Sequence, residues 1–177
     1  MIGFSDLQKE LHTCDSKLEL HTITSDKIVF EECVKLNCFY CKNYNHKWTC
    51  PPRIPDLDYE AILKEYENIA VILYRTDVNE DNFETLRNES TNKVHSSVLV
   101  LEKFLWQNNY PLAISFIGGS CKLCKNDCAT EKCMNKGVAR IPVEALGINV
   151  VKTMKNINID VVFPPDSSLM RCGMILW

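Results

Sequence analysis

The sequence predicts an α/β or α+β fold, in which a small mixed sheet is flanked by helices and carries two cysteine-rich loops. Three observations predict it. Short, β-branched apolar runs suit buried strands, longer segments repeat apolar residues at helical spacing, and eight of the ten cysteines gather in two places. The length of 177 residues fits one domain, 1–177, with a single core.

The middle of the chain predicts a strand, a long helix and a second strand. Residues 69–74 form a continuous apolar run that suits a buried strand, and residues 112–117 are a second candidate for a buried strand. A helix is expected from Asp81 to about Asn108, because its apolar residues recur at steps of three and four, namely Val94, Val98, Leu101 and Leu105. A crossover of this length favours parallel pairing of the two strands.

Shorter elements are expected on either side. Asp56 or Asp58 can cap a helix that runs to about Tyr66. The other expected elements are an antiparallel strand at 18–23, short helices at 143–146 and 150–157, and an edge or closing strand at 170–177.

Charge and hydropathy limit the partners that are expected. The chain has 23 acidic and 20 basic side chains and a net charge of -3, so neither nucleic acid nor a membrane is an expected partner. The N-terminus lacks the pattern of a secretory signal, and no run approaches the ~20 apolar residues of a membrane span. We therefore expect a cytoplasmic protein, in which clustered cysteines more often hold a metal or do redox chemistry than form disulfides.

The second cysteine loop, residues 121–133, has the spacing C-x2-C-x3-C-x4-C, formed by Cys121, Cys124, Cys128 and Cys133. Structural zinc sites usually use two ligand pairs separated by a dozen or more residues, whereas ferredoxins use dense cysteine runs. The spacing predicts a [4Fe-4S] cluster, with zinc or metal-free thiols as alternatives. Gly118 and Gly119, just before the loop, are expected to offer backbone N–H groups to the cofactor.

The first cysteine loop, residues 33–50, contains Cys38, Cys41 and Cys50, with Cys33 upstream as a possible fourth ligand. Three arrangements are open. Each loop can hold its own four-cysteine site, the loops can share ligands, or three cysteines can hold a cluster with one iron open to substrate. Whether Cys33 is a ligand decides among these three arrangements.

The remaining cysteines and histidines are expected to have no metal role. Cys14 and Cys172 are expected to be small buried side chains. His46 is expected to be an exposed loop residue, because four cysteines already suffice for a site. Surface or packing positions are expected for His12, His21 and His95.

The segments CFYCKNYNHKWTCPP and GGSCKLCKNDCATEKCMNKGVARIPVEALGINVVKT resemble those of a predicted metal-binding family of unknown function. The family carries C-x2-C-x-Y…W-x-CPP and then G-x-C-x-x-C…C…C, so the resemblance covers most of residues 33–155. It implies metal binding and little about a reaction. It implicates all the loop cysteines except Cys33, and it also points to Arg140, Glu144 and Gly147. The chain has Ile141-Pro142 where the family has Pro-Ser.

Arg140 and Glu144 are four residues apart, a spacing that suits an ion pair on one helical face. Alternatively, Arg140 binds an anionic ligand or balances the charge of a cluster, because its guanidinium suits both roles.

The leading functional expectation is an iron–sulfur protein that transfers single electrons to or from a redox partner protein. One alternative is a cluster-dependent enzyme with an open iron, acting in sulfur transfer or reductive activation. The other is a zinc-stabilised adaptor module. The number of clusters and the oligomeric state do not follow from the sequence.

Overall fold

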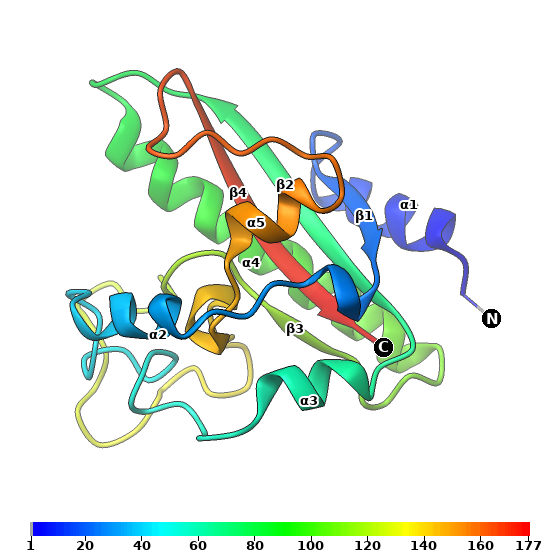
Figure 1. The fold of residues 1–177 in the computed structure, drawn as a ribbon, viewed down its shortest axis with the longest axis horizontal. Coiled ribbons are helices and arrows are strands. Elements are labelled where there is room, and N and C mark those ends of the chain that lie inside the picture. Colours follow the sequence, from blue (N-terminus) through cyan, green and yellow to red (C-terminus); the bar gives the residue numbers. More distant parts are fainter. Residues whose placement is uncertain (1) are drawn as a thin grey trace.

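The computed structural model describes residues 2–177 and has a four-stranded sheet at its centre, with strand order β1-β2-β4-β3 (Figure 1). The strands are β1 (Glu19–Ile23), β2 (Ile69–Asp77), β3 (Ile114–Phe116) and β4 (Ser168–Leu176). The helices are α1 (Phe4–Cys14), α2 (Glu32–Phe39), α3 (Tyr59–Lys64), α4 (Phe83–Gln107) and α5 (Val150–Lys155), with 3-10 turns η1 (Ser25–Lys27) and η2 (Val143–Leu146). The predicted fold class, a small sheet flanked by helices, is confirmed.

The three strand pairings in the sheet are antiparallel. β2 and β3 run in the same direction, but β4 lies between them, so the parallel pairing that we expected between these two strands is wrong. The expectation that residues 170–177 form an edge or closing strand is also wrong. β4 has a central place because Met174 and Ile175 on its two faces are both fully buried, one in each core.

Helices cover both faces of the sheet. On one face, α1 and α4 pack against side chains of β2 such as Ala70 and Ile72. On the other face, α3, η2 and α5 pack against Val71 and Leu73. These two residues alternate along β2 with Ala70 and Ile72, so their side chains point to the opposite face of the sheet. α4 lies so close to β4 that a Cβ on Gly173 would be 2.7 Å from a methyl group of Val94. Among residues 2–177, no helix has both the length and the apolar character needed to cross a membrane.

Most local elements lie where the sequence predicts them, and two helices were missed. Asp58 is the residue that caps α3, since its carboxylate accepts a hydrogen bond of 2.9 Å from the backbone N–H of Ala61. α1 was missed because Leu7 and Leu11 are its only fully buried side chains. α2 was missed because it lies within the first cysteine loop and has no buried side chain.

Candidate metal site at two adjoining cysteine loops

The second cysteine loop starts and ends at one point of the sheet. Ile117, which follows β3, forms a parallel bridge with Pro142. The N–H of Ile117 donates to the carbonyl of Ile141 at 3.1 Å, and the N–H of Val143 donates back to Ile117 at 2.8 Å. These bonds hold the ends of the loop together, so the four cysteines between them are confined to a short excursion from the sheet.

The two glycines that precede this loop have different structural roles. Gly118 lies against β4 so closely that a Cβ would overlap the carbonyl oxygen of Cys172. Gly119 has a φ of +76°, and its N–H donates to a carboxylate oxygen of Glu144 at 3.3 Å. The N–H that we expected to face a cofactor is therefore directed at a carboxylate, and a cofactor role for Gly118 and Gly119 stays a prediction.

Arg140 lies just after the second loop and pairs with Glu102 of α4. Its Nε donates to both carboxylate oxygens, at 2.9 and 3.1 Å, and its Nη2 also bonds this carboxylate. The same carboxylate accepts the backbone N–H of Ser115 at 2.6 Å, and the Glu102 side chain is 2% exposed. The expected ion pair with Glu144 is wrong, because the backbone directs Arg140 toward α4. A role for Arg140 toward a cofactor stays a prediction.

The first cysteine loop is attached to the segment that follows the second one. Phe30 bridges to Ile148, and the N–H of Glu31 donates to the carbonyl of Gly147 at 2.9 Å. The Glu31 carboxylate also accepts from the Asn149 amide at 2.6 Å. α2 starts immediately after these contacts and packs against η2, so both cysteine loops are anchored around residues 141–149.

The two cysteine loops contact each other directly. The indole N–H of Trp48 donates to the carbonyl of Ala129 at 2.7 Å, and the Lys47 ammonium lies 2.9 Å from the Asp127 carboxylate. The Arg53 guanidinium lies over the Trp48 ring, 4.6 Å from its centroid. The cyan and yellow segments at the lower left of Figure 1 show the resulting arrangement of the loops.

Cys50 and Cys121 are the buried cysteines of the two loops. Burial, together with the nearby Cys41 and Cys38 sulfurs, raises the pKa of the Cys50 thiol to about 12, and Cys121 also contributes to the increase. Burial raises the pKa of Cys121 as well, with a further contribution from Cys128, Cys124 and Cys133. The two buried thiols are therefore neutral at pH 7, and a metal that binds them must displace their protons.

The cysteines approach one another, but they do not surround a common centre. In the part of the chain that the structure describes, no three His, Cys, Asp or Glu side chains are grouped so that they could hold a metal ion. All ten cysteines are free thiols. Cys33 is exposed on α2, and its thiol donates to the Glu31 carboxylate at 3.6 Å. It does not contribute to the raised pKa values of Cys38 and Cys50.

The chemistry of the donor set suits a soft metal or an iron–sulfur cluster. Each loop also directs a side-chain amide at a sulfur: Asn43 donates to Cys41 at 3.5 Å, and Asn135 donates to Cys124 at 3.3 Å. Hydrogen bonds to ligand sulfurs of this kind tune the properties of a bound metal. The sequence analysis missed both asparagines, and the only signal for Asn43 is its position two residues after a cysteine.

The other cysteines and histidines lie outside this arrangement. Cys172 is buried as expected, and burial raises its pKa to about 12, whereas Cys14 is half-buried. His46 is exposed, as expected. His95 is 1% exposed on α4, with Nε2 at 2.7 Å from the carbonyl of Val138, so it packs against the segment that follows the second loop.

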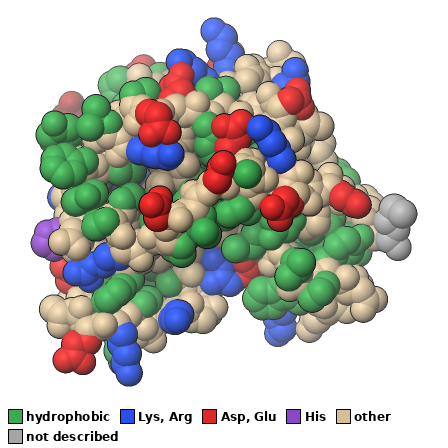
Figure 2. All heavy atoms as spheres, turned by 60° about the horizontal axis from the view of Figure 1, so that its bottom comes forward, with side chains coloured by type: hydrophobic (Ala, Val, Ile, Leu, Met, Phe, Trp, Pro, Cys, Tyr) green, Lys and Arg blue, Asp and Glu red, His purple; other side chains and the backbone are tan. Residues whose placement is uncertain are grey.

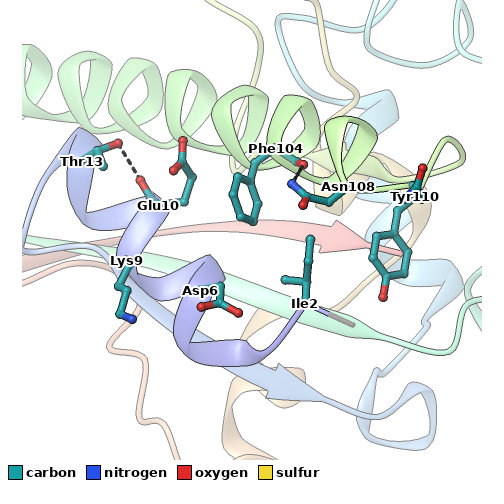
Figure 3. Close-up of a pocket in the computed structure, with 9 residues that line it drawn as sticks. Ile2, Asp6, Lys9, Glu10, Thr13, Phe104, Asn108 and Tyr110 are labelled. Atoms are coloured by element: carbon teal, nitrogen blue, oxygen red, sulfur yellow. Dashed lines mark hydrogen bonds between the residues drawn. The ribbon is translucent and has the colours of Figure 1, made fainter.

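Two cavities differ in their relation to the cysteines. A groove of about 430 Å³ lies where the loops meet and includes Cys124 among its lining residues. A larger cavity of about 830 Å³ lies between α1 and the end of α4 (Figure 3). Its lining mixes the apolar side chains of Ile2 and Phe104 with charged ones from α1 and contains no cysteine. The smaller groove is therefore the one that belongs to the candidate metal site.

A protein-family model described as "Predicted metal-binding protein (DUF2284)" matches residues 21–177. The matched region contains both cysteine loops and almost the whole sheet, and it leaves out α1. No curated protein and no solved structure matches the chain.

Proposed function

The chain belongs to this family of predicted metal-binding proteins, and on that premise we propose that it is an iron–sulfur protein that exchanges single electrons with a partner protein in the cytoplasm. When bound, a [4Fe-4S] cluster supplies reversible one-electron oxidation and reduction. The observation that carries the proposal is the contact between two cysteine loops, with a buried cysteine in each, Cys50 and Cys121.

The second loop contains enough cysteines to supply all the ligands of one cluster. Its four thiols, Cys121, Cys124, Cys128 and Cys133, lie between chain ends that are held together at Ile117. Four cysteine thiolates are the usual ligands of a [4Fe-4S] cluster, and so short a run favours it over zinc, whose paired ligands are usually further apart.

Residues beside the cysteines would control the properties of the site. The amides of Asn43 and Asn135 donate to the sulfurs of Cys41 and Cys124, and would continue to do so when these sulfurs bind a metal. Trp48 covers the junction and joins the loops through its indole N–H. These groups would orient the ligands and limit the access of water, which are the two means by which a protein tunes a cluster.

A cluster-dependent enzyme with an open iron is the second candidate, and one observation favours it. The Cys33 thiol is directed at Glu31, whereas Cys38 and Cys41 lie close enough to Cys50 to contribute to its raised pKa. The first loop would therefore offer three cysteines to a cluster, Cys38, Cys41 and Cys50. Three protein ligands leave one iron available to substrate, as in catalytic metal sites. Such an enzyme would carry out sulfur transfer or reductive activation.

The first test is anaerobic purification followed by iron, zinc and acid-labile sulfide analysis, with visible spectra before and after reduction. We expect a brown protein that bleaches on reduction and holds about eight irons and about eight sulfides, since each four-iron cluster uses about four thiolates. About four irons would indicate a single cluster. Zinc without sulfide would contradict the proposal and leave the zinc-stabilised adaptor.

Cysteine variants then assign the ligands. Cys124→Ser is expected to lose about half of the iron, because it removes one of four ligands of one cluster. Cys14→Ser, half-buried in α1, is the matched control and is expected to keep all the iron. If Cys33→Ser keeps all the iron and an added small thiol changes the visible spectrum, the open-iron enzyme is favoured over the electron carrier.

A further inference from the structure

The two cysteine loops make the molecule electrically asymmetric. Residues 33–50 and 121–133 contain six Lys and two Asp or Glu, a net charge of +4, so the rest of the chain carries -7. Figure 2 shows Lys and Arg side chains at the lower left, on the side where the loops lie in Figure 1. Such a separation of charge orients a protein as it approaches a charged partner.

The positive charge is concentrated along the groove between the loops. The groove is lined by Lys42, Lys47, Lys122 and Lys125 from the two loops, together with Asn43, His46, Cys124 and Asp127. Lys47 pairs with Asp127, but among residues 2–177 no carboxylate forms a salt bridge with Lys42, Lys122 or Lys125. The groove therefore brings together ammonium groups that lack a counter-charge within the chain.

Lys122 places one of these charges at a half-buried position, in the same groove as Lys42 and Lys47. Like charges gathered in one groove repel one another, so the cluster is better explained by an anionic group that binds from outside than by stabilisation of the chain.

Exposed aromatic side chains at the end of α2 indicate which kind of anionic partner fits. Phe39 and Tyr40 are 56% and 77% exposed, and Phe39 stacks edge-on with Tyr44, with ring centroids 5.0 Å apart. Lys42 lies two residues after Tyr40 in the chain. Aromatic anchors beside charged residues are typical of protein–protein interfaces, whereas a small anion gains nothing from them. The charge of -7 on the rest of the chain disfavours nucleic acid.

We infer that the groove between the cysteine loops, together with the exposed Phe39 and Tyr40 that precede Lys42 in the chain, docks an acidic protein that is the one-electron carrier of the proposed function. The identity of the partner as an electron carrier rests on that function, whereas the docking surface rests on the charges alone. In one encounter the reduced partner loses one electron and the oxidised chain gains it, with no bond made or broken. Cys124 lines the groove, so the partner contacts the loop that would hold a cluster.

The test is titration calorimetry of the purified chain with an acidic plant-type [2Fe-2S] ferredoxin, and with basic cytochrome c for comparison. We expect the chain to bind the ferredoxin, with affinity falling about tenfold or more between 50 and 300 mM salt, because screening weakens charge complementarity. Binding of cytochrome c in preference to the ferredoxin, or ferredoxin binding that salt leaves unchanged, would overturn the inference.

Charge-reversal variants locate the surface. The triple variant Lys42→Glu, Lys122→Glu, Lys125→Glu is expected to weaken ferredoxin binding about a hundredfold or more. The control triple variant, Lys9→Glu, Lys17→Glu, Lys103→Glu, makes the same change in net charge at exposed positions elsewhere and is expected to stay within about threefold of wild type. Equal losses in both triples would overturn the inference. The double variant of the exposed Lys42 and Lys125 replaces the groove triple if half-buried Lys122→Glu impairs folding.

Two further readouts separate this inference from the proposed function. The iron content of the groove variant is expected to equal that of wild type, and its midpoint potential is expected to fall, because negative charge is placed beside the loop cysteines. A shifted potential with unchanged ferredoxin affinity would mean that the lysines serve the cofactor, and would overturn the docking surface. If the chain holds no iron but still binds the ferredoxin through these lysines, the proposed function fails and the docking surface stands.

Binding of a 20-nucleotide single strand is a separate test. If the chain binds this strand more tightly than it binds the ferredoxin, the groove is a nucleic-acid site and the inference is overturned.

Discussion

The central sheet and the two cysteine loops are held in place by different forces. Residues 69–73 of β2 are all buried, with neighbouring strands on both sides and helices on both faces. In the loops, by contrast, Thr49, Cys50 and Cys121 are the buried residues. The loops are joined to each other by the Trp48 hydrogen bond and the Lys47 ion pair.

This difference shows which part of the molecule can fold without help. The sheet buries enough apolar surface to offset the entropy lost on ordering the chain, whereas the loops bury almost none. Ordering the loops therefore needs another source of free energy. Metal binding by thiolates supplies it in small metal-stabilised folds, so the comparison predicts that a chelator loosens the loops before it affects the sheet.

The largest expected effect is on the scaffold. Glu102→Ala removes the carboxylate that accepts hydrogen bonds from Nε and Nη2 of Arg140 and from the backbone N–H of Ser115. We expect the free energy of unfolding to fall by about 3–5 kcal/mol, as when one partner of a buried ion pair is removed. Urea denaturation measures it. Glu102→Gln, which keeps an acceptor for Ser115, is expected to lose less, and an unchanged urea midpoint for Glu102→Ala would show that the pair does not hold the second loop to α4.

A smaller effect is expected where the second loop leaves the sheet. Gly118→Ala places a methyl group on the Cys172 carbonyl oxygen, and we expect a loss of about 1–3 kcal/mol from the strain. Gly137→Ala is the matched control in the same excursion, because no atom lies within 4 Å of the added methyl group. Thermal unfolding of both variants separates the two cases. Equal midpoints would contradict the close approach at Gly118.

A change confined to the loops should leave the sheet intact. Trp48→Phe removes the hydrogen bond to Ala129 and is expected to weaken the contact between the loops by about 0.5–1.5 kcal/mol. Hydrogen exchange is expected to accelerate in both loops and to stay unchanged in β2 and β4. Trp106→Phe removes a comparable bond to Ala113 away from the loops. If hydrogen exchange in the cysteine loops also accelerates in Trp106→Phe, the conclusion that the loops and the sheet are stabilised separately would be wrong.

The smallest effect concerns pH. Burial lowers the pKa of His95, the Val138 carbonyl opposes this shift, and the Arg140 charge adds to it. The unfolded chain takes up a proton below about pH 6.5 while the folded chain resists it. Stability from His95 is therefore complete above about pH 6.5 and is lost as the pH falls below it. Urea midpoints at pH 7.5 and 5.5 are expected to differ less in His95→Gln than in wild type, and an equal difference would assign the loss to other groups.

Much of the local structure could be predicted because its causes are local. The apolar run of β2, the repeat of Val94, Val98 and Leu101 in α4, and the cap at Asp58 all act within a few residues. Periodicity reports such elements directly. α2 could not be predicted in this way, because it has no buried side chain. Its sequence therefore has no apolar repeat at helical spacing that could be recognised within the cysteine loop.

Pairings between distant segments could not be predicted in this way. β4 sits between β2 and β3, Arg140 pairs with Glu102 and not with Glu144, and Trp48 meets Ala129 across 81 residues of chain. None of these contacts produces a recognisable pattern in the sequence, because each depends on how separate elements pack.

The sequence by itself determined the elements of the sheet and the spacing of the cysteines, since both are properties of neighbouring residues. Only the tertiary structure decided that the two cysteine loops adjoin and that their lysines line one groove. The physical reason is that both loops are anchored around residues 141–149, where backbone bridges to Phe30 and Ile117 bring together segments that lie far apart along the chain.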